Sequence, residues 1–313
     1  MKGTKKGTLK KIVWITAAVA VVSLGIAAVL FFATGIDRPW ESGKGIIVDE
    51  KRSFASGGIE KLEVRTSSTD VLVGTGEGNT VDVRLHGTVY TGQAAAVPAL
   101  AAERVGDVID ISTERKDGRR WVLGFFSSNL ILEIEVPDQY RGALAVHTSS
   151  GDVEISDRIL SELSVRTSSG RIELHSIQAG TVSMDSSSGD QTAEGMNAGY
   201  SKMTSSSGDI RAKGLQGEAR VESSSGDLTL RYGQFDSDLE VRSSSGDVEL
   251  FLTEAAEFRV EARASSGDID CAFPVTLSGA DSEMRRNRLF GAVGEGTHRV
   301  VVHTSSGDIT IRP

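Results

Sequence analysis

Seven aspartates that directly follow a glycine are the most suggestive candidates for chemistry in this 313-residue chain. They are Asp152, Asp190, Asp209, Asp227, Asp247, Asp268 and Asp308. If the segments that carry them stack, the carboxylates line one edge, where a calcium ion bridging their oxygens would relieve the repulsion between them. Each segment offers a single acid, however, whereas calcium takes about six to eight oxygen ligands. We therefore interpret the carboxylates first as caps of their own turns and keep calcium binding as the alternative.

Sequence signatures of catalysis are missing. The five histidines are scattered, and none has the spacing of a metal-ligand pair with another histidine or with the single cysteine, Cys271. The sequence has no nucleophile elbow and no phosphate-binding loop. Cys271 follows Ile269 in an alternating pattern, which indicates a small core residue. The sequence thus predicts a protein that is not an enzyme and has no cofactor, calcium being the one alternative.

The aspartates belong to a repeated Ser-Ser-Gly-Asp motif whose glycines are spaced 19, 19, 19, 18, 20, 21 and 40 residues apart. These glycines are Gly151, Gly170, Gly189, Gly208, Gly226, Gly246, Gly267 and Gly307. We interpret the last interval as two periods, one of them unmarked. Apolar and polar residues alternate on both sides of each turn, as in Leu163–Leu174, which predicts two short half-buried strands per repeat. We expect the glycine to supply a backbone angle that other residues avoid.

Two strands and two corners in about 19 residues predict an all-β fold, a repetitive β-solenoid of stacked coils. An antiparallel meander is the alternative, but a near-constant period favours coils that must match in length. The coil around Gly189 carries Gln191 where other coils have an aliphatic residue, which predicts a soft spot. Ser278–Gly296 breaks the pattern and is expected to bulge out as a loop, whereas Val300–Ile311 is expected to form an ordered last coil with an exposed edge.

The sequence divides into five segments. They are a basic cytoplasmic tail (1–11), an apolar transmembrane anchor (12–33), a polar linker (34–58), an irregular β cap or early coils (59–140), and the repeat solenoid (141–313). The apolar segment is long enough to cross a bilayer as a helix, and the five lysines before it place the N-terminus in the cytoplasm. A cleaved signal peptide is the alternative. We expect a single-pass cell membrane protein whose β domain is extracytoplasmic.

Charge limits the class of partner. The formal net charge is −9 although the tail is basic, so the remainder is more acidic still, and nucleic acid is not an expected partner. Outward positions are basic before the turns, at His147, Arg166, Arg242, Arg263 and His303. They are acidic after the turns, at Glu154, Glu173, Glu249 and Asp270. This pattern indicates either a face for a charged glycan or wall polymer, or a solvated sheet with weak cross-strand pairs.

Three features together resemble a known family: the apolar N-terminal segment, the run Gly124–Pro137, and the serial turns from Thr148 to Asp308. The chain is similar over residues 59–313 to the bacterial putative-adhesin family, which is built on a β-strand-repeat domain of unknown function and includes LiaG-like proteins encoded beside cell-envelope stress systems. The resemblance implies a β-solenoid displayed on the outer side of the cytoplasmic membrane. It transfers no catalytic residue.

Two functions follow as hypotheses. The first is a non-catalytic, membrane-anchored binding, adhesin-like or scaffold module that contacts a cell-wall polymer, a glycan or another envelope protein. The second is a regulatory subunit of a membrane envelope-stress signalling system. The expected cytoplasmic tail is too short to hold a signalling domain, so the second function would act through a partner in the membrane.

Overall fold

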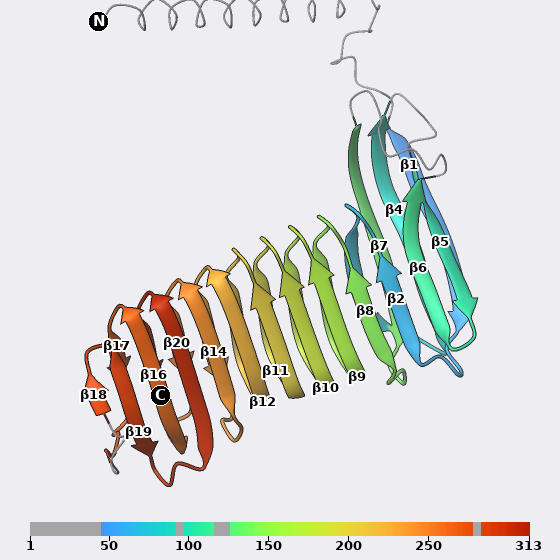
Figure 1. Ribbon diagram of the computed structural model, residues 1–313. Helices are drawn as coiled ribbons and strands as arrows, with labels where there is room; N and C mark the ends of the chain where they lie inside the picture. Colours follow the sequence, from blue (N-terminus) through green and yellow to red (C-terminus); the bar gives the residue numbers. More distant parts are fainter. Residues whose placement is uncertain (1–44, 92–96, 116–125, 278–282) are drawn as a thin grey trace, which may run out of the picture.

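The computed structural model describes residues 45–91, 97–115, 126–277 and 283–313 (Figure 1). The expected tail, the expected anchor at 12–33 and the first part of the expected linker lie outside the described residues. Within the described residues no helix is long and apolar enough to cross a membrane. Every regular element in these ranges is a β-strand, as the repeat pattern predicts.

The strands follow one another along the chain in the order of their numbers. They are β1 (Ile46–Ala55), β2 (Lys61–Arg65), β3 (Asp70–Gly76), β4 (Thr80–Thr91), β5 (Pro98–Val105), β6 (Val108–Arg115), β7 (Phe126–Pro137), β8 (Ala143–His147), β9 (Val153–Thr167), β10 (Ile172–Ser186), β11 (Gln191–Ser205), β12 (Ile210–Ser225), β13 (Leu228–Tyr232), β14 (Leu239–Ser245), β15 (Val248–Phe251), β16 (Phe258–Ser266), β17 (Ile269–Cys271), β18 (Glu283–Arg285), β19 (Arg288–Val293), β20 (His298–Ser306) and β21 (Ile309–Arg312).

Four long parallel strands, β9 to β12, form the middle of an elongated rod (Figure 1). They pair in register, so Val153, Ile172 and Gln191, which stand one repeat apart in the sequence, lie side by side. Each long strand turns a corner, and its two halves belong to opposite walls of the rod. A Ser-Ser-Gly turn then leads into the next coil. Because consecutive neighbours are parallel, the structure is a stack of coils and the meander alternative is wrong.

We call one wall of this rod the front wall. It consists of β5, β6, β2 and β8, the second halves of β9 to β12, and β14, β20, β16 and β19. The back wall holds the first halves of β9 to β12 and the strands that pair with them. Between the walls lies a continuous core of mostly Val, Ile and Leu side chains. The alternation of buried and exposed residues along each strand supplies that core.

The cap end begins earlier in the sequence than expected. Residues 46–55, assigned to a linker from the sequence, form β1, which pairs with β4 in antiparallel orientation. The unit β2–β3 lies between β8–β9 and β6–β7, so the order of units in space differs from their order in the chain. The antiparallel strands β1, β4 and β5 then end the rod, with β1 pairing only with β4 and β5 only with β6 among the described residues.

The far end of the rod corrects three expectations from the sequence. The last unit, β20–β21, lies between β14–β15 and β16–β17, so both of its edges are paired and neither is exposed. The long interval before Gly307 therefore contains no unmarked coil. Within 278–296, residues 283–285 and 288–293 form the strands β18 and β19 instead of a loop, and β19 covers β16 in antiparallel orientation.

The turn glycines stack on one another so closely that a side chain has no room. A Cβ atom built on Gly170 would lie 1.9 Å from the carbonyl oxygen of Gly151, and one on Gly189 would lie 1.8 Å from that of Gly170. Positive φ angles occur at four of the eight turn glycines, namely Gly226, Gly246, Gly267 and Gly307. The expected positive φ angle thus explains the need for glycine at only those four positions. At the others the close approach of a neighbouring carbonyl requires glycine.

The second corner of each coil contains a column of left-handed residues. Asp157, Ser176, Gly195 and Gly214 occupy this corner in successive repeats and have φ angles of 55°, 54°, 68° and 71°. Only two of these positions carry glycine. At the other two, Asp157 and Ser176 adopt a backbone conformation that is unfavourable in free energy for any residue with a side chain. The corner geometry is therefore imposed by the stacking of the coils.

A buried arginine joins the cap to the first long coil. Arg158 is 1% exposed and occupies the corner position that Ile177 holds in the next coil. Its guanidinium donates to the carbonyl oxygens of Val136 at 2.8 Å and Pro137 at 3.0 Å, both at the end of β7. Burial lowers the pKa of Arg158, but an arginine stays charged in proteins. The side chain thus ties the first long coil to the end of β7, where the carbonyl oxygen of Pro137 also accepts the N–H of Tyr140.

Gln191 is fully buried in the column that otherwise holds Val153, Ile172 and Ile210. Its Nε2 donates to the carbonyl oxygen of Thr204 at 2.5 Å, while its Oε1 is buried with no hydrogen-bond partner. An unsatisfied buried acceptor costs free energy. The soft spot inferred from the sequence remains a prediction, with this atom as its physical cause.

We predict that Gly189→Ala lowers the free energy of unfolding by about 3 kcal/mol, because a methyl group would collide with backbone that cannot move aside. Urea unfolding followed by circular dichroism measures the change. Gly74→Ala is the matched control, since a Cβ there meets no atom within 4 Å, and it should raise stability by about 0.5 kcal/mol. Equal stability of the two variants would contradict the stacking argument.

We predict that Gln191→Leu raises the free energy of unfolding by about 1–2 kcal/mol, because it removes the unsatisfied acceptor and restores the aliphatic column. The urea midpoint measures this change. Thr192→Leu, one residue along on the outward side of the strand, should give no such gain. A loss of stability in Gln191→Leu would mean that the bond to Thr204 outweighs the buried Oε1.

Candidate functional site

The aspartates at the turn edge form a ladder that joins neighbouring coils. The Oδ1 atom of Asp190 accepts the backbone N–H of Asp209 at 2.9 Å, and Oδ1 of Asp209 accepts that of Asp227 at 2.9 Å. The same bond is made by Asp152 to Arg171, by Asp227 to Asp247, by Asp247 to Asp308 and by Asp308 to Asp268, at 2.7–3.0 Å. Six of the seven candidate aspartates therefore cap the adjacent coil, whereas the sequence analysis assigned the caps to their own turns.

The two ends of this carboxylate ladder differ from its middle. At the cap end Asp70 caps the amide of Asp152, a role the sequence analysis missed because Thr69 replaces the marker glycine. At the far end Asp268 contacts the guanidinium of Arg286. Within the described residues no group of three or more His, Cys, Asp or Glu side chains could hold a metal ion. The geometry supports a structural role for the ladder, and calcium binding stays an untested alternative.

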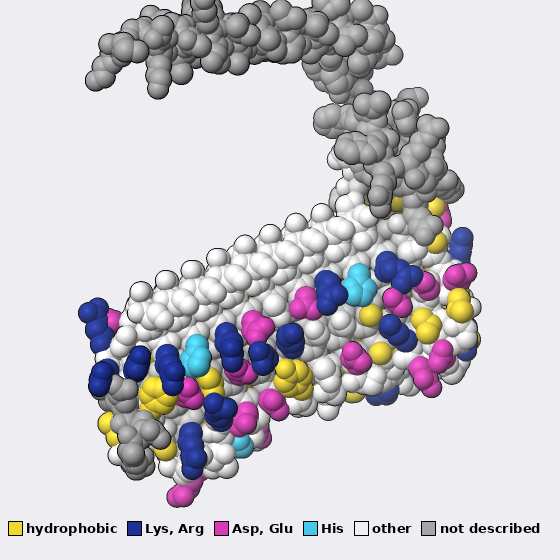
Figure 2. Space-filling model, viewed as in Figure 1, with side chains coloured by type: hydrophobic (Ala, Val, Ile, Leu, Met, Phe, Trp, Pro, Cys, Tyr) yellow, Lys and Arg dark blue, Asp and Glu magenta, His cyan; other side chains and the backbone are white. Residues whose placement is uncertain are grey.

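Hydroxyl groups complete four of the turns from the inside, those of Gly151, Gly170, Gly189 and Gly208. The Oγ1 atoms of Thr148 and Thr167 accept the N–H groups of Gly151 at 3.0 Å and Gly170 at 2.9 Å. Ser186 does the same for the next glycine at 2.8 Å. The upper edge of the rod in Figure 2 is a regular ridge of mostly uncharged residues, with dark blue side chains at its left end. The turn edge offers a ligand repeated serine hydroxyls beside the carboxylate ladder and Arg171.

Basic side chains form a row on the front wall just below the turns (Figure 2). The register places in this row all five basic residues expected to precede the turns, which are His147, Arg166, Arg242, His303 and Arg263. Burial lowers the pKa of His147, and the nearby Arg166 acts in the same direction, so its imidazole is neutral at pH 7. The expected acids Glu154, Glu173, Glu249 and Asp270 lie on the back wall.

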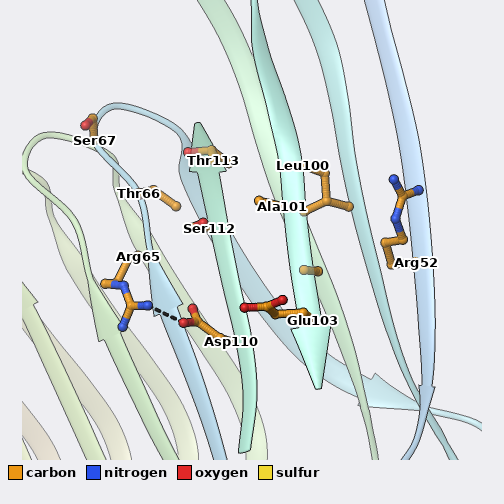
Figure 3. A pocket seen from close by; sticks show the side chains of 11 residues that line it. Arg52, Arg65, Thr66, Ser67, Leu100, Ala101, Glu103, Asp110, Ser112 and Thr113 are labelled. Atoms are coloured by element: carbon orange, nitrogen blue, oxygen red, sulfur yellow. Dashed lines mark hydrogen bonds and ion pairs between the residues drawn. The ribbon is translucent and has the colours of Figure 1, made fainter. Parts of the chain in front are cut away.

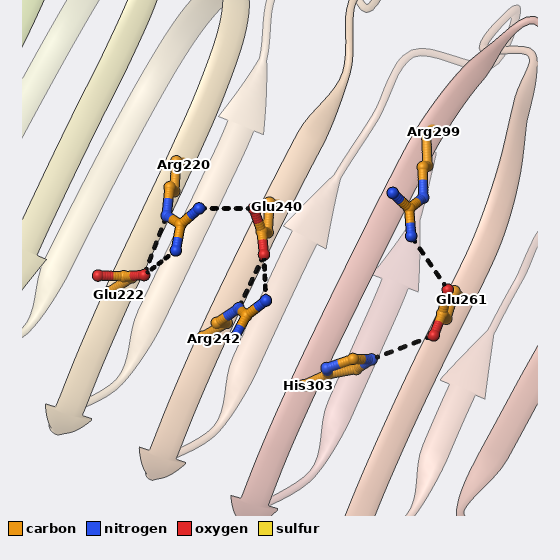
Figure 4. Close-up of polar contacts among 7 residues, drawn as sticks. All are labelled: Arg220, Glu222, Glu240, Arg242, Glu261, Arg299 and His303. Carbon is orange, nitrogen blue, oxygen red and sulfur yellow. Dashed lines mark hydrogen bonds and ion pairs between the residues drawn. The ribbon is translucent and has the colours of Figure 1, made fainter.

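Ion pairs connect the front-wall strands near the far end (Figure 4). Arg220 contacts Glu222 at 2.6 Å and Glu240 at 3.1 Å, and Arg242 contacts Glu240 at 2.7 Å. The hydrogen bond from Arg242 lowers the pKa of Glu240. These side chains are partly exposed, so each pair adds little to stability. They do hold the long side chains in fixed positions on the wall.

Three hollows open on the front wall. The first, of about 650 Å³ in the cap, is bounded by Arg52 on β1, Arg65 on β2, and Ser112 and Asp110 on β6 (Figure 3). Arg65 contacts Asp110, whose Oδ1 is buried without a hydrogen-bond partner. The sequence did not reveal this site, because its residues lie on β1, β2 and β6, and β6 is far from the other two strands in the chain and joins them only in the fold.

The other two hollows meet near the far end of the rod. One of about 340 Å³ lies over β11, β12, β14 and β20, and one of about 960 Å³ lies over β16, β19 and β20. Arg299 and Asp238 border both. The front wall thus has one hollow in the cap and two near its far end, and each is lined by both basic and acidic side chains.

Cys271 packs against the edge of the core and is a free thiol. Burial raises the pKa of this thiol, which keeps it protonated and poorly nucleophilic at neutral pH. Its position agrees with the interpretation as a small core residue.

A protein-family model described as Toastrack DUF4097 matches residues 59–312 of the chain. Among solved structures, a putative adhesin from Bacteroides fragilis is similar at 13% identity and a TM-score of 0.47, covering 84% of this chain and 97% of that one. A putative adhesin from Parabacteroides distasonis is similar at 14% identity and a TM-score of 0.45, with 86% and 98% covered. A putative lipid binding protein from the same species shows 13% identity and a TM-score of 0.45, with 84% and 96% covered. No curated protein gives a significant match.

We predict that Asp227→Ala lowers the free energy of unfolding by about 1 kcal/mol, because the amide of Asp247 loses its acceptor. Asp227→Asn keeps an oxygen at the same place and should retain the stability of the unsubstituted protein. Thermal unfolding compares the three proteins, each with calcium and with a chelator. A melting temperature that rises with calcium and loses that rise in Asp227→Asn would contradict the purely structural role.

Proposed function

Since the chain belongs to the Toastrack DUF4097 family, we propose that it is a non-catalytic, adhesin-like binding module of the bacterial cell envelope. In this proposal residues 12–33 anchor the protein in the cytoplasmic membrane, with the N-terminus in the cytoplasm. The β rod stands outside the membrane and contacts a wall polymer, a glycan or another envelope protein through its front wall.

The observation that carries this proposal is the regular front wall. Its strands are in register from β5 to β19, and the three described hollows open along it. Side chains therefore recur at a spacing of about 4.8 Å over many coils. Repeat proteins use extended surfaces of this kind to bind extended partners. Such a wall suits many weak contacts along a ligand better than one enclosed reaction site.

The position of the cap supports the proposed orientation. β1 begins at Ile46 at the cap end of the rod, so this end is nearest to the proposed anchor. The segment between position 33 and β1 reaches at most about 45 Å when extended. The rod would then project its far end, with β16 to β21, away from the membrane and toward envelope material.

The regulatory alternative finds no support in the fold or in the matched family. Nucleic acid is also not a proposed partner, because the charge of the chain is −9 and its basic side chains are interleaved with acids over most of the front wall.

The proposal is tested by blocking one wall at a time. In a Cys271→Ser background, the full chain carries either Ser164→Cys on the front wall or Thr192→Cys on the back wall, and each new thiol is coupled to a bulky polyethylene glycol maleimide. Co-sedimentation with envelope fragments from the source bacterium measures binding. We expect the front-wall label to weaken binding about tenfold or more, a loss of about 1.4 kcal/mol, and the back-wall label to leave it unchanged.

Equal effects of the two labels would contradict the assignment to the front wall. Failure of the unlabelled full chain to sediment with envelope fragments would contradict the proposed function itself.

A further inference from the structure

The far end of the front wall is basic although the body of the chain is acidic. Strands β20, β16 and β19 present five basic side chains there, which are Arg299, His303, Arg259, Arg263 and Arg288. We call these five residues the basic end patch. Among the described residues of these three strands, Glu261 is the one acid whose side chain points outward from the front wall. Dark blue side chains accordingly crowd the left end of the rod in Figure 2.

Like charges face each other directly across neighbouring strands of the basic end patch. Arg299 lies beside Arg259, and Arg263 lies beside Arg288. Like charges directly opposite on a sheet are destabilising. Because these facing arginines repel one another, a negatively charged group that binds between them would stabilise the patch.

The single carboxylate of Glu261 cannot supply that compensation alone. It is shared by Arg299 at 3.3 Å, Arg263 at 3.3 Å and the ring of His303 at 3.5 Å (Figure 4). Arg259 and Arg288 make no ion pair with any residue in the described ranges. Guanidinium donors of the patch are therefore left for a ligand.

The floor between these side chains is uncharged. In the row of outward residues that crosses the strands, Val301 of β20 lies between Glu240 of β14 and Glu261 of β16. Phe290 of β19 lies on the other side of Glu261. The guanidinium carbon of Arg263 lies 4.7 Å from the centre of the Phe290 ring, which fixes the arginine in place. The short Val301 side chain leaves a depression that Glu240 and Glu261 border across the strands and that Arg299 and His303 border along β20.

The two hollows at this end run along the rod axis and share Arg299 at their border. Together they cross six strands, from β11 to β19, which at about 4.8 Å per strand gives a trough of about 24 Å. A linear ligand in this trough would meet a new strand about every 5 Å.

The lining of the two hollows also contains the carboxylates of Glu218, Asp238, Glu240, Glu261 and Glu295. The guanidinium groups left for a ligand are therefore those without an ion pair among the described residues, Arg259 in the trough and Arg288 beside it. Planar guanidinium groups bind carboxylate and phosphate oxygens in pairs, so these arginines suit acidic groups of a chain.

We propose that the basic end patch binds a linear acidic polymer that lies along the rod axis and carries phosphate or carboxylate groups on successive units, with Arg299 as the central contact. This assignment of ligand chemistry rests on the proposed function of the front wall. The insertion of β20 between β14 and β16 brings Arg299 and His303 into the patch.

Titration calorimetry on the purified full chain tests the proposal with three probes: polyphosphate, polygalacturonate and neutral dextran. We expect binding of at least one of the two polyanions, weakened by added salt, and no binding of dextran. The double variant Arg299→Gln/Arg263→Gln should lose about tenfold or more in polyanion affinity. Circular dichroism verifies that the variant keeps its fold.

Arg166→Gln is the matched control. Arg166 lies in the same row of the front wall, and its side chain is 63% exposed against 65% for Arg299, but it stands on β9 outside the patch. We expect it to bind polyanions as the unsubstituted chain does. A loss equal to that of the double variant would show binding by diffuse charge and overturn the assignment of the patch.

Envelope sedimentation separates this inference from the proposed function. If the chain binds envelope fragments but neither polyanion, the ligand chemistry is wrong and the binding function stands. The inference is also overturned if the double variant loses polyanion affinity but binds envelope fragments normally, or if vesicles of anionic phospholipid bind while both soluble polyanions do not. Loss of both polyanion and envelope binding in the double variant, with Arg166→Gln unaffected, is the expected result.

Discussion

The close contact between turn glycines is the constraint on which the rest of the structure depends. A carbonyl oxygen of one coil lies where the next coil would place a Cβ atom, at 1.8–2.6 Å for the eight turn glycines. In these eight turns the coils can approach to sheet spacing at this edge only because glycine stands there, whereas Thr69 takes this place in the unit β2–β3. That requirement fixes the register, and the register in turn aligns every other side chain of a coil with its counterpart in the next.

Because the coils are in register, equivalent residues of successive coils form columns along the rod. Hydroxyls inside four of the turns bind glycine amides, and carboxylates outside bind the amides of the adjacent coil. Basic side chains gather in one row on the front wall. The first two columns hold the rod together, which leaves the front wall free to display its side chains. Antiparallel strands replace the parallel stacking of the coils at both ends of the rod. The result is a finite, rigid rod with one hollowed wall.

The sequence reveals the repeat but not the order in which its ends are assembled. Glycine spacing and strict alternation identify the all-β coils, because both follow from rules that act within one repeat. Gly246, Gly267 and Gly307 have equivalent local sequences, so nothing in them shows that the last coil lies between the other two. The same limit hides the partner of each aspartate and the buried role of Arg158, since these depend on residues of neighbouring units. The basic end patch could not be recognised for this reason.

The order of the last three coils in space assembles the basic end patch, because it places β20 between β14 and β16. Arg242, His303 and Arg263 lie in one row on β14, β20 and β16, with His303 in the middle. Disulfides form when Cα atoms are about 4.4–6.8 Å apart, which adjacent strands satisfy and strands separated by a third do not. In a Cys271→Ser background, the pair Arg242→Cys and His303→Cys should therefore oxidise readily, while Arg242→Cys and Arg263→Cys should stay reduced. The reverse result would mean that the coils stack in chain order, and it would contradict this account.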